Sequence, residues 1–73
     1  MIEVRLFASL RTGRDKIIKL DSNSFSVAGE VLKHLSIEAE EVAIYLINGR
    51  HSDLDAPIKD GDIIAIFPPV GGG

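Results

Sequence analysis

The sequence predicts a single α+β domain in which one helix packs across one face of a β-sheet. With 73 residues, the chain has room for one small hydrophobic core and for no second domain. Its composition, 45% hydrophobic and 26% charged, is apolar enough to fold. Apolar residues follow strand-like patterns in several stretches and helical spacing in only one. Since the chain has no cysteine, packing and backbone hydrogen bonds must hold the fold together.

The first half predicts a β-hairpin. Residues 1–8 alternate, with Ile2, Val4 and Leu6 on one side and Phe7 on the other, as in a half-buried strand. Residues 9–15 are rich in polar turn formers and glycine, and a short β-branched stretch follows at residues 16–20. The two stretches therefore predict neighbouring strands joined by a loop.

A helix of about ten residues is predicted next, with Ser26 as its N-cap. The helical spacing is carried by four apolar residues, Val27, Val31, Leu32 and Leu35. A capping box from Ser26 requires a glutamate at position 29, but Gly29 stands there and Glu30 comes one position later. The start of the helix is therefore open to a small shift.

The second half predicts two more strands and an irregular crossing. Residues 42–47 form an apolar run typical of a central strand, and Asn48-Gly49 predicts a tight turn. Residues 51–59 predict a loop-rich crossing with room for one short edge strand. A turn at residues 60–62 leads into the last strand, residues 63–67, which Pro68-Pro69 ends because proline donates no backbone hydrogen bond.

Composition excludes several classes of function. The net charge is −3, and the eight Lys and Arg are dispersed among eleven Asp and Glu, which argues against a nucleic-acid partner. Residues 1–8 resemble neither a signal peptide nor a membrane-spanning helix, so we expect a cytoplasmic protein with no membrane partner. His34 and His51 lack metal-ligand spacing, and the paired aspartates flank turns instead of forming a calcium loop (Asp53, Asp55, Asp60 and Asp62).

The end of the chain is its most unusual feature. Three of the seven glycines, Gly71, Gly72 and Gly73, follow two prolines and Val70. No helix follows them, which excludes a phosphate-binding glycine loop. Residues 68–73 can extend about 20 Å at about 3.3 Å per residue. A tail without side chains fits a narrow channel, so we expect residues 1–67 to be the domain and residues 68–73 a flexible tail that delivers a carboxylate; a frayed terminus is the alternative.

An exposed aromatic patch is predicted at the root of this tail. If Ile64 and Ile66 face the core, Ala65 and Phe67 face outward, as does Phe7. Should the first and last strands be neighbours, the outward residues form one docking patch; the opposite register and two unrelated aromatics are the alternatives. As a surface substitution, Phe7→Asp is then expected to change stability by only about 0.5 kcal/mol.

Four stretches resemble the small ubiquitin-like sulfur carriers over nearly the whole chain. They are Leu6-Phe7-Ala8-Ser9-Leu10-Arg11, Ile47-Asn48-Gly49-Arg50, Lys59-Asp60-Gly61-Asp62 and Phe67-Pro68-Pro69-Val70-Gly71-Gly72-Gly73. The last looks most like the molybdopterin synthase small subunit, and the thiazole-forming carrier is a related branch. The resemblance implies a ubiquitin-like β-grasp fold, a mixed sheet of four to five strands with one main helix.

The resemblance also implies a mechanism in which partners supply the catalysis. An E1-like enzyme, using ATP and Mg²⁺, adenylates the Gly73 carboxylate, and a sulfurtransferase converts it to a thiocarboxylate. The tail then enters the molybdopterin synthase large subunit. Phe7 and Phe67 become docking residues, Arg11 a weaker interface candidate, and Gly71, Gly72, Pro68, Pro69 and Val70 the remaining binding residues. The domain itself is expected to bind no cofactor and to be a monomer alone.

Three other functions remain open from the sequence. A carrier for thiazole synthesis differs only in the acceptor of sulfur. A protein modifier uses the same C-terminus to form isopeptide bonds, and archaeal ubiquitin-like modifiers share much of this ending. A plain interaction domain makes no chemical use of its tail. The compressed loop between the first two strands and the third terminal glycine depart from the molybdopterin branch and weaken the choice of pathway.

Overall fold

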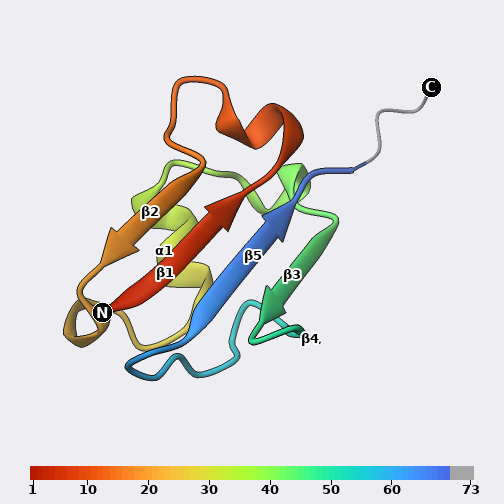
Figure 1. Ribbon diagram of the computed structural model, residues 1–73. Helices are drawn as coiled ribbons and strands as arrows, with labels where there is room; N and C mark the ends of the chain where they lie inside the picture. Colours follow the sequence, from red (N-terminus) through yellow and green to blue (C-terminus); the bar gives the residue numbers. More distant parts are fainter. Residues whose placement is uncertain (70–73) are drawn as a thin grey trace.

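The structure, a computed structural model, describes residues 1–69. One five-stranded sheet has the order β2-β1-β5-β3-β4, with β1 and β5 parallel and the other pairs antiparallel. Helix α1 lies across one face of it (Figure 1). The strands are β1 (Ile2–Leu6), β2 (Ile17–Leu20), β3 (Ile44–Ile47), β4 (Arg50–His51) and β5 (Ile63–Phe67); the helices are α1 (Ala28–His34) and the 3₁₀ turns η1 (Ala8–Arg11), η2 (Ser22–Ser24) and η3 (Ala39–Glu41). This confirms the α+β prediction, the hairpin and the last strand.

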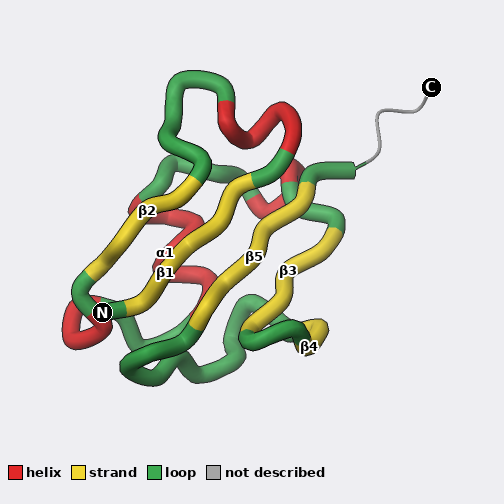
Figure 2. The backbone as a smooth tube through the Cα atoms, in the orientation of Figure 1, coloured by secondary structure: helices red, strands yellow, loops and turns green. Residues whose placement is uncertain are grey.

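The core lies between α1 and the sheet. Val31 and Leu32 of α1 are buried there. They pack with the alternate residues of β1 and β5, which are fully buried: Ile2, Val4, Leu6, Ile64 and Ile66. The Tyr45 hydroxyl donates a hydrogen bond to the Ala28 carbonyl at 3.2 Å, and burial raises the pKa of this phenol. Since α1 covers one face, the other residues of each strand form a second face that no part of residues 1–69 covers (Figures 1 and 2).

The helix is shorter than predicted and begins later. It has seven residues, with Val27 in place of Ser26 as the N-cap. The Glu30 carboxylate accepts backbone N–H bonds from Ser26 at 2.5 Å and Val27 at 3.2 Å, which lowers the pKa of Glu30. Val27 has no side-chain acceptor, so only the carboxylate half of a capping box exists here. The late glutamate thus sets a later helix start.

The loop before β5 supplies the missing caps. The backbone N–H of Ala28 donates to the Ala56 carbonyl at 3.0 Å, and that of Gly29 to the Leu54 carbonyl at 2.6 Å. A β-carbon at Gly29 would lie 3.1 Å from the Leu54 oxygen, closer than most such contacts. The glycine that breaks the capping box therefore lets this loop approach the helix.

Two predicted strands are also shorter than their apolar runs. The first ends at Leu6 because Ala8 has φ 52° and begins η1, a turn that the sequence did not indicate. The third begins at Ile44, two residues later than predicted, since η3 extends to Glu41 and Val42 is its C-cap. The Asn48-Gly49 turn is confirmed, with φ 53° and 81°, and it joins β3 to the short edge strand β4.

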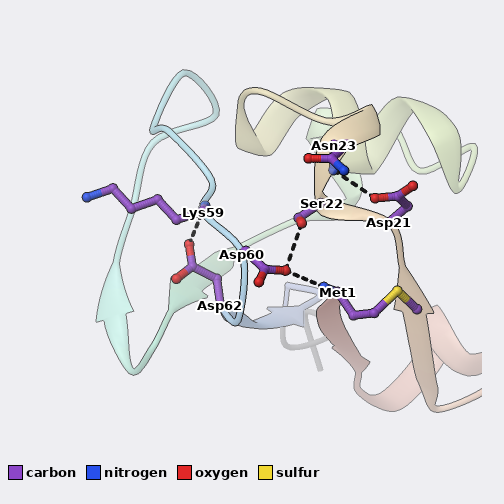
Figure 3. Close-up of polar contacts among 7 residues, drawn as sticks. All are labelled: Met1, Asp21, Ser22, Asn23, Lys59, Asp60 and Asp62. Carbon is purple, nitrogen blue, oxygen red and sulfur yellow. Dashed lines mark hydrogen bonds and ion pairs between the residues drawn. The ribbon is translucent and has the colours of Figure 1, made fainter.

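A cluster of polar contacts closes the end of the sheet where β1 and β5 begin (Figure 3). The Asp60 carboxylate accepts a hydrogen bond from Ser22 Oγ at 2.8 Å and pairs with the Met1 amino group. The bond from that amino group is the main reason the pKa of Asp60 is lowered. Asp62 accepts from the Lys59 backbone N–H at 2.8 Å and from Asn48 Nδ2 at 2.9 Å. We call this cluster the polar clamp; it comprises Met1, Ser22, Asn48, Lys59, Asp60 and Asp62.

Candidate docking surface

An aromatic pair stands at the opposite end of the same two strands. The rings of Phe7 and Phe67 stack with centroids 4.2 Å apart and planes 11° from parallel. The parallel register that pairs Leu6 with Ile66 carries on to these residues, and the Phe7 N–H donates to the Ile66 carbonyl at 3.3 Å. The expectation that the first and last strands are neighbours with both aromatics on one face is confirmed.

Ala65 lies on this uncovered face but one row away from the stack. Its register partners are Arg5 on β1 and Leu46 on β3. The predicted patch is therefore two adjacent rows of side chains, and the aromatic row is the one next to the chain exit. Other large apolar side chains of the same face are exposed as well, among them Ile17, Ile44 and Ile63.

A hollow of about 510 Å³ opens beside the stack. It is lined by Phe7, Ala8, Ser9, Ile44, Phe67, Pro68 and Pro69, which we call the aromatic hollow. Ile44 enters it because β3 pairs with β5 so that Ile44 lies opposite Phe67. The sequence did not indicate Ile44, Ala8 or Ser9, since no local pattern gives the strand order or the η1 turn. Val70, Gly71, Gly72 and Gly73 lie outside the described residues.

Arg11 lies against the stack. Its Nε donates to the Leu6 carbonyl at 2.8 Å, and its guanidinium carbon is 5.5 Å from the centre of the Phe7 ring. A cation over an aromatic face at this distance is attracted by the ring quadrupole. The predicted interface candidate thus also holds Phe7 in place from the side of η1.

Arg14, which the sequence did not single out, fixes the η1 turn. Its three side-chain nitrogens donate to the carbonyls of Leu35 at 3.2 Å, Leu10 at 3.2 Å and Ser36 at 3.3 Å. The turn that forms one wall of the aromatic hollow is therefore attached to the C-terminal end of α1. All three acceptors are backbone groups, so residue types gave no sign of these contacts.

The sequence predicts neither a metal site nor a membrane-spanning helix. His34 packs edge-on against Phe25 with centroids 5.2 Å apart, and His51 is on β4. Within residues 1–69, no three His, Cys, Asp or Glu side chains gather in a group able to hold a metal ion. In the same range, no helix is long and apolar enough to cross a membrane.

A mixed five-stranded sheet crossed by one helix is the architecture of the small ubiquitin-like β-grasp proteins. The profile of the ThiS family matches residues 4–73, and the chain belongs to that family. It is 33% identical to the molybdopterin synthase sulfur carrier subunit of Haemophilus influenzae, over all of both chains.

Solved structures share the same architecture. SAMP1 from Haloferax volcanii has a TM-score of 0.76 at 27% identity, covering 99% of this chain and 98% of its own. A chain in the complex of subunits 1 and 2 of molybdopterin-converting factor from Helicobacter pylori has a TM-score of 0.67 at 27% identity, covering 99% and 97%. These likenesses confirm the ubiquitin-like β-grasp fold that the resemblance implied.

Proposed function

We propose that this protein is a sulfur carrier for molybdopterin synthesis and that the carboxyl group of Gly73 carries the sulfur. The observation that carries the proposal is the aromatic hollow, because it lies where the chain leaves β5 toward its three glycines. Full-length similarity to a molybdopterin synthase sulfur carrier subunit supports the pathway.

The proposed chemistry leaves catalysis to partners. A carboxylate is stabilised by resonance and resists nucleophiles, so an E1-like enzyme first joins a Gly73 oxygen to the α-phosphorus of ATP and releases pyrophosphate. The terminal sulfur of a persulfide on the sulfurtransferase then attacks the carbonyl carbon, and AMP leaves with its electron pair. A thiol reductant cleaves the S–S bond of the resulting acyl disulfide and releases the carrier. The product is a thiocarboxylate, a soft nucleophile at neutral pH. ATP and Mg²⁺ belong to the activating enzyme in this scheme.

The acceptor is proposed to be the large subunit of molybdopterin synthase. The related Helicobacter pylori protein was solved in a complex of subunits 1 and 2 of molybdopterin-converting factor. An apolar side chain of the large subunit would fill the aromatic hollow and so position the tail. The four residues after Pro69 can span about 13 Å, at about 3.3 Å per residue. Glycines make this segment narrow, at the entropic cost of ordering them on binding.

Intact-mass spectrometry tests the chemistry directly. After incubation with the activating enzyme from the same organism, ATP, Mg²⁺ and a sulfur source, the protein should gain the mass of one oxygen-to-sulfur exchange, located at Gly73. Deleting Gly73 should abolish the gain, and thermal unfolding should be unchanged because a terminal glycine has no side chain to contribute to packing. The activating enzyme must first be shown to form the adenylate of another carrier. With that active enzyme, an unchanged mass for the folded wild type would contradict the proposal.

A protein modifier is the second candidate, favoured by the similarity to SAMP1, the small archaeal modifier protein 1 of Haloferax volcanii. It would use the same adenylate but transfer Gly73 to lysine amines of other proteins. Tagged protein expressed in its host would then form covalent conjugates that vanish when Gly73 is deleted. Conjugates without any thiocarboxylate would favour this function over sulfur transfer.

A further inference from the structure

Charge is distributed unevenly in this molecule. Residues 1–20 contain five Lys or Arg and two Asp or Glu, a net charge of +3. Residues 21–73 contain three Lys or Arg and nine Asp or Glu, a net charge of −6. The first segment forms β1, η1 and β2, which lie together on one side of β5 (Figure 1). A protein with a net charge of −3 thus has a cationic side, and that side adjoins the aromatic hollow.

Most cations of this segment already have partners. Glu3 pairs with Arg5 at 2.5 Å and with Lys19 at 3.5 Å, and the bond from Arg5 is the main reason the pKa of Glu3 is lowered. Arg14 donates to three carbonyls, as described above. Arg11 and Lys16 are different, because neither forms an ion pair with any residue in the range 1–69.

These two cations share a second, smaller hollow of about 280 Å³. Its lining comprises Arg5, Leu6, Phe7, Arg11, Lys16 and Ile17. Phe7 lines both this hollow and the aromatic hollow, so the two lie next to each other. The Nε bond to Leu6 fixes the Arg11 guanidinium, and its terminal nitrogens are not among the donors of any side-chain hydrogen bond within residues 1–69. A guanidinium that is held in place, and whose two terminal nitrogens can still donate, matches the geometry of a carboxylate.

We propose that the partner which fills the aromatic hollow also places an Asp or Glu carboxylate between Arg11 and Lys16. The partner is the large synthase subunit, so this inference rests on the proposed function and adds the chemistry of the contact. Unpaired cations beside an apolar hollow are complementary to an acidic group beside an apolar anchor. Residues 21–73 of the carrier have a net charge of −6. In other orientations they would repel the partner's carboxylate, which disfavours those orientations.

Two charge-matched double variants test the proposal. Arg11→Glu/Lys16→Glu and Lys33→Glu/Lys59→Glu change the net charge equally, but Lys33 is on α1 and Lys59 is in the polar clamp. Affinity for the purified large subunit of the same organism is measured by calorimetry at low and high salt. We expect the first variant to bind about 30-fold more weakly and the second to stay within about twofold of wild type. Wild-type affinity should fall with salt, and the salt dependence should be smaller for the first variant.

The affinities of the two double variants distinguish a local charge pairing from an effect of net charge. Equal losses for both double variants would show an effect of net charge and overturn the proposal, as would no loss for either. Arg11→Glu also removes the bond to Leu6, so a thermal melt is measured; if that double variant is unfolded, Lys16→Glu against Lys33→Glu decides in the same way. If the wild type forms its thiocarboxylate and binds the large subunit, but the variants bind equally well, only the charge pairing fails. If the wild type does not bind the large subunit, the proposed acceptor fails as well.

Discussion

The two ends of the central strands differ in how their surface groups are satisfied. Where β1 and β5 begin, the polar clamp pairs its carboxylates with backbone N–H groups, a hydroxyl, an amide and an amino group of the same chain. Where these strands end, the apolar lining of the aromatic hollow lies next to two cations, Arg11 and Lys16, that form no ion pair within residues 1–69. One end therefore serves the fold, and the other is available to a partner.

The parallel pairing of β1 with β5 explains why the two ends are so distinct. Parallel strands begin at one edge of a sheet and end at the other, so chain segments before both strands meet at one end and segments after both meet at the other. Asp60 and Met1 precede their strands, whereas Phe7 and Pro68 follow theirs. The chain exit toward the glycines thus coincides with the apolar end.

The largest expected effect is at the aromatic end. Phe67→Ala removes half of the stack and part of the lining of the aromatic hollow, and affinity for the large subunit should fall about 30-fold, as for a central interface aromatic. The free energy of unfolding should fall by about 1 kcal/mol, because an aromatic pair contributes about 0.5–1.5 kcal/mol. Calorimetry and chemical denaturation measure the two effects.

Ile63→Ala is the matched control for that experiment. Ile63 is 40% exposed on the same face of the same strand, but at the end of the polar clamp. Its affinity should stay within about threefold of wild type, because rim contacts contribute little. Equal losses for the two variants would mean that the whole face docks and that the two ends do not differ.

At the polar end we expect an effect on stability alone, with no loss of affinity for the partner. Asn48 has φ 53°, donates to Asp62 at 2.9 Å and accepts from the Ile63 N–H at 2.9 Å. Asn48→Ala loses both bonds and strains the turn, so unfolding free energy should fall by about 1–2 kcal/mol. Asn48→Gly keeps the backbone conformation and should cost less. A glycine variant as unstable as the alanine variant would show that the backbone conformation contributes nothing.

The smallest effect concerns pH. The amino group of Met1 and the Ser22 hydroxyl lower the pKa of Asp60 in the folded state. A pKa that is lower in the folded state stabilises the fold at pH values above the unfolded-state pKa of about 4. This contribution is lost as the pH falls through the folded-state pKa. Asp60→Asn should be slightly less stable than wild type at pH 7, and the difference should shrink as the pH falls through the lowered pKa of Asp60. Denaturation at a series of pH values measures the difference, and a gap that persists in acid would contradict this assignment.

Local patterns predicted much of the fold because they act over a few residues. The alternation of Ile2, Val4 and Leu6 and the φ preferences of Asn48 and Gly49 needed no knowledge of distant segments. The helix start was wrong, since its first N–H groups are capped by the loop carbonyls of Leu54 and Ala56, more than 20 residues away. No side-chain type marks a backbone carbonyl as a helix cap.

In the candidate docking surface too, some features follow from local sequence and others from the tertiary structure. The alternation of side chains predicted that Phe7 and Phe67 face outward, but their contact at 4.2 Å depends on the order of the strands. Because the two rings stack, each residue is half-buried. The expected cost of Phe7→Asp therefore rises from about 0.5 to about 1 kcal/mol, since a stacked ring loses more than an isolated surface group. Ile44 and Arg14 could not be predicted, as one depends on β3 pairing with β5 and the other on three carbonyls.

The sequence by itself determined the class of fold, the outward direction of the two aromatics and the glycine-rich ending, because periodicity and composition are properties of neighbouring residues. Only the tertiary structure decided that the two aromatics touch, that Ile44 joins them, and that Arg11 and Lys16 remain without an ion pair among residues 1–69 beside the chain exit. The physical reason is that contact and charge pairing depend on which distant segments become neighbours. Here the parallel pairing of β1 with β5 brings them together.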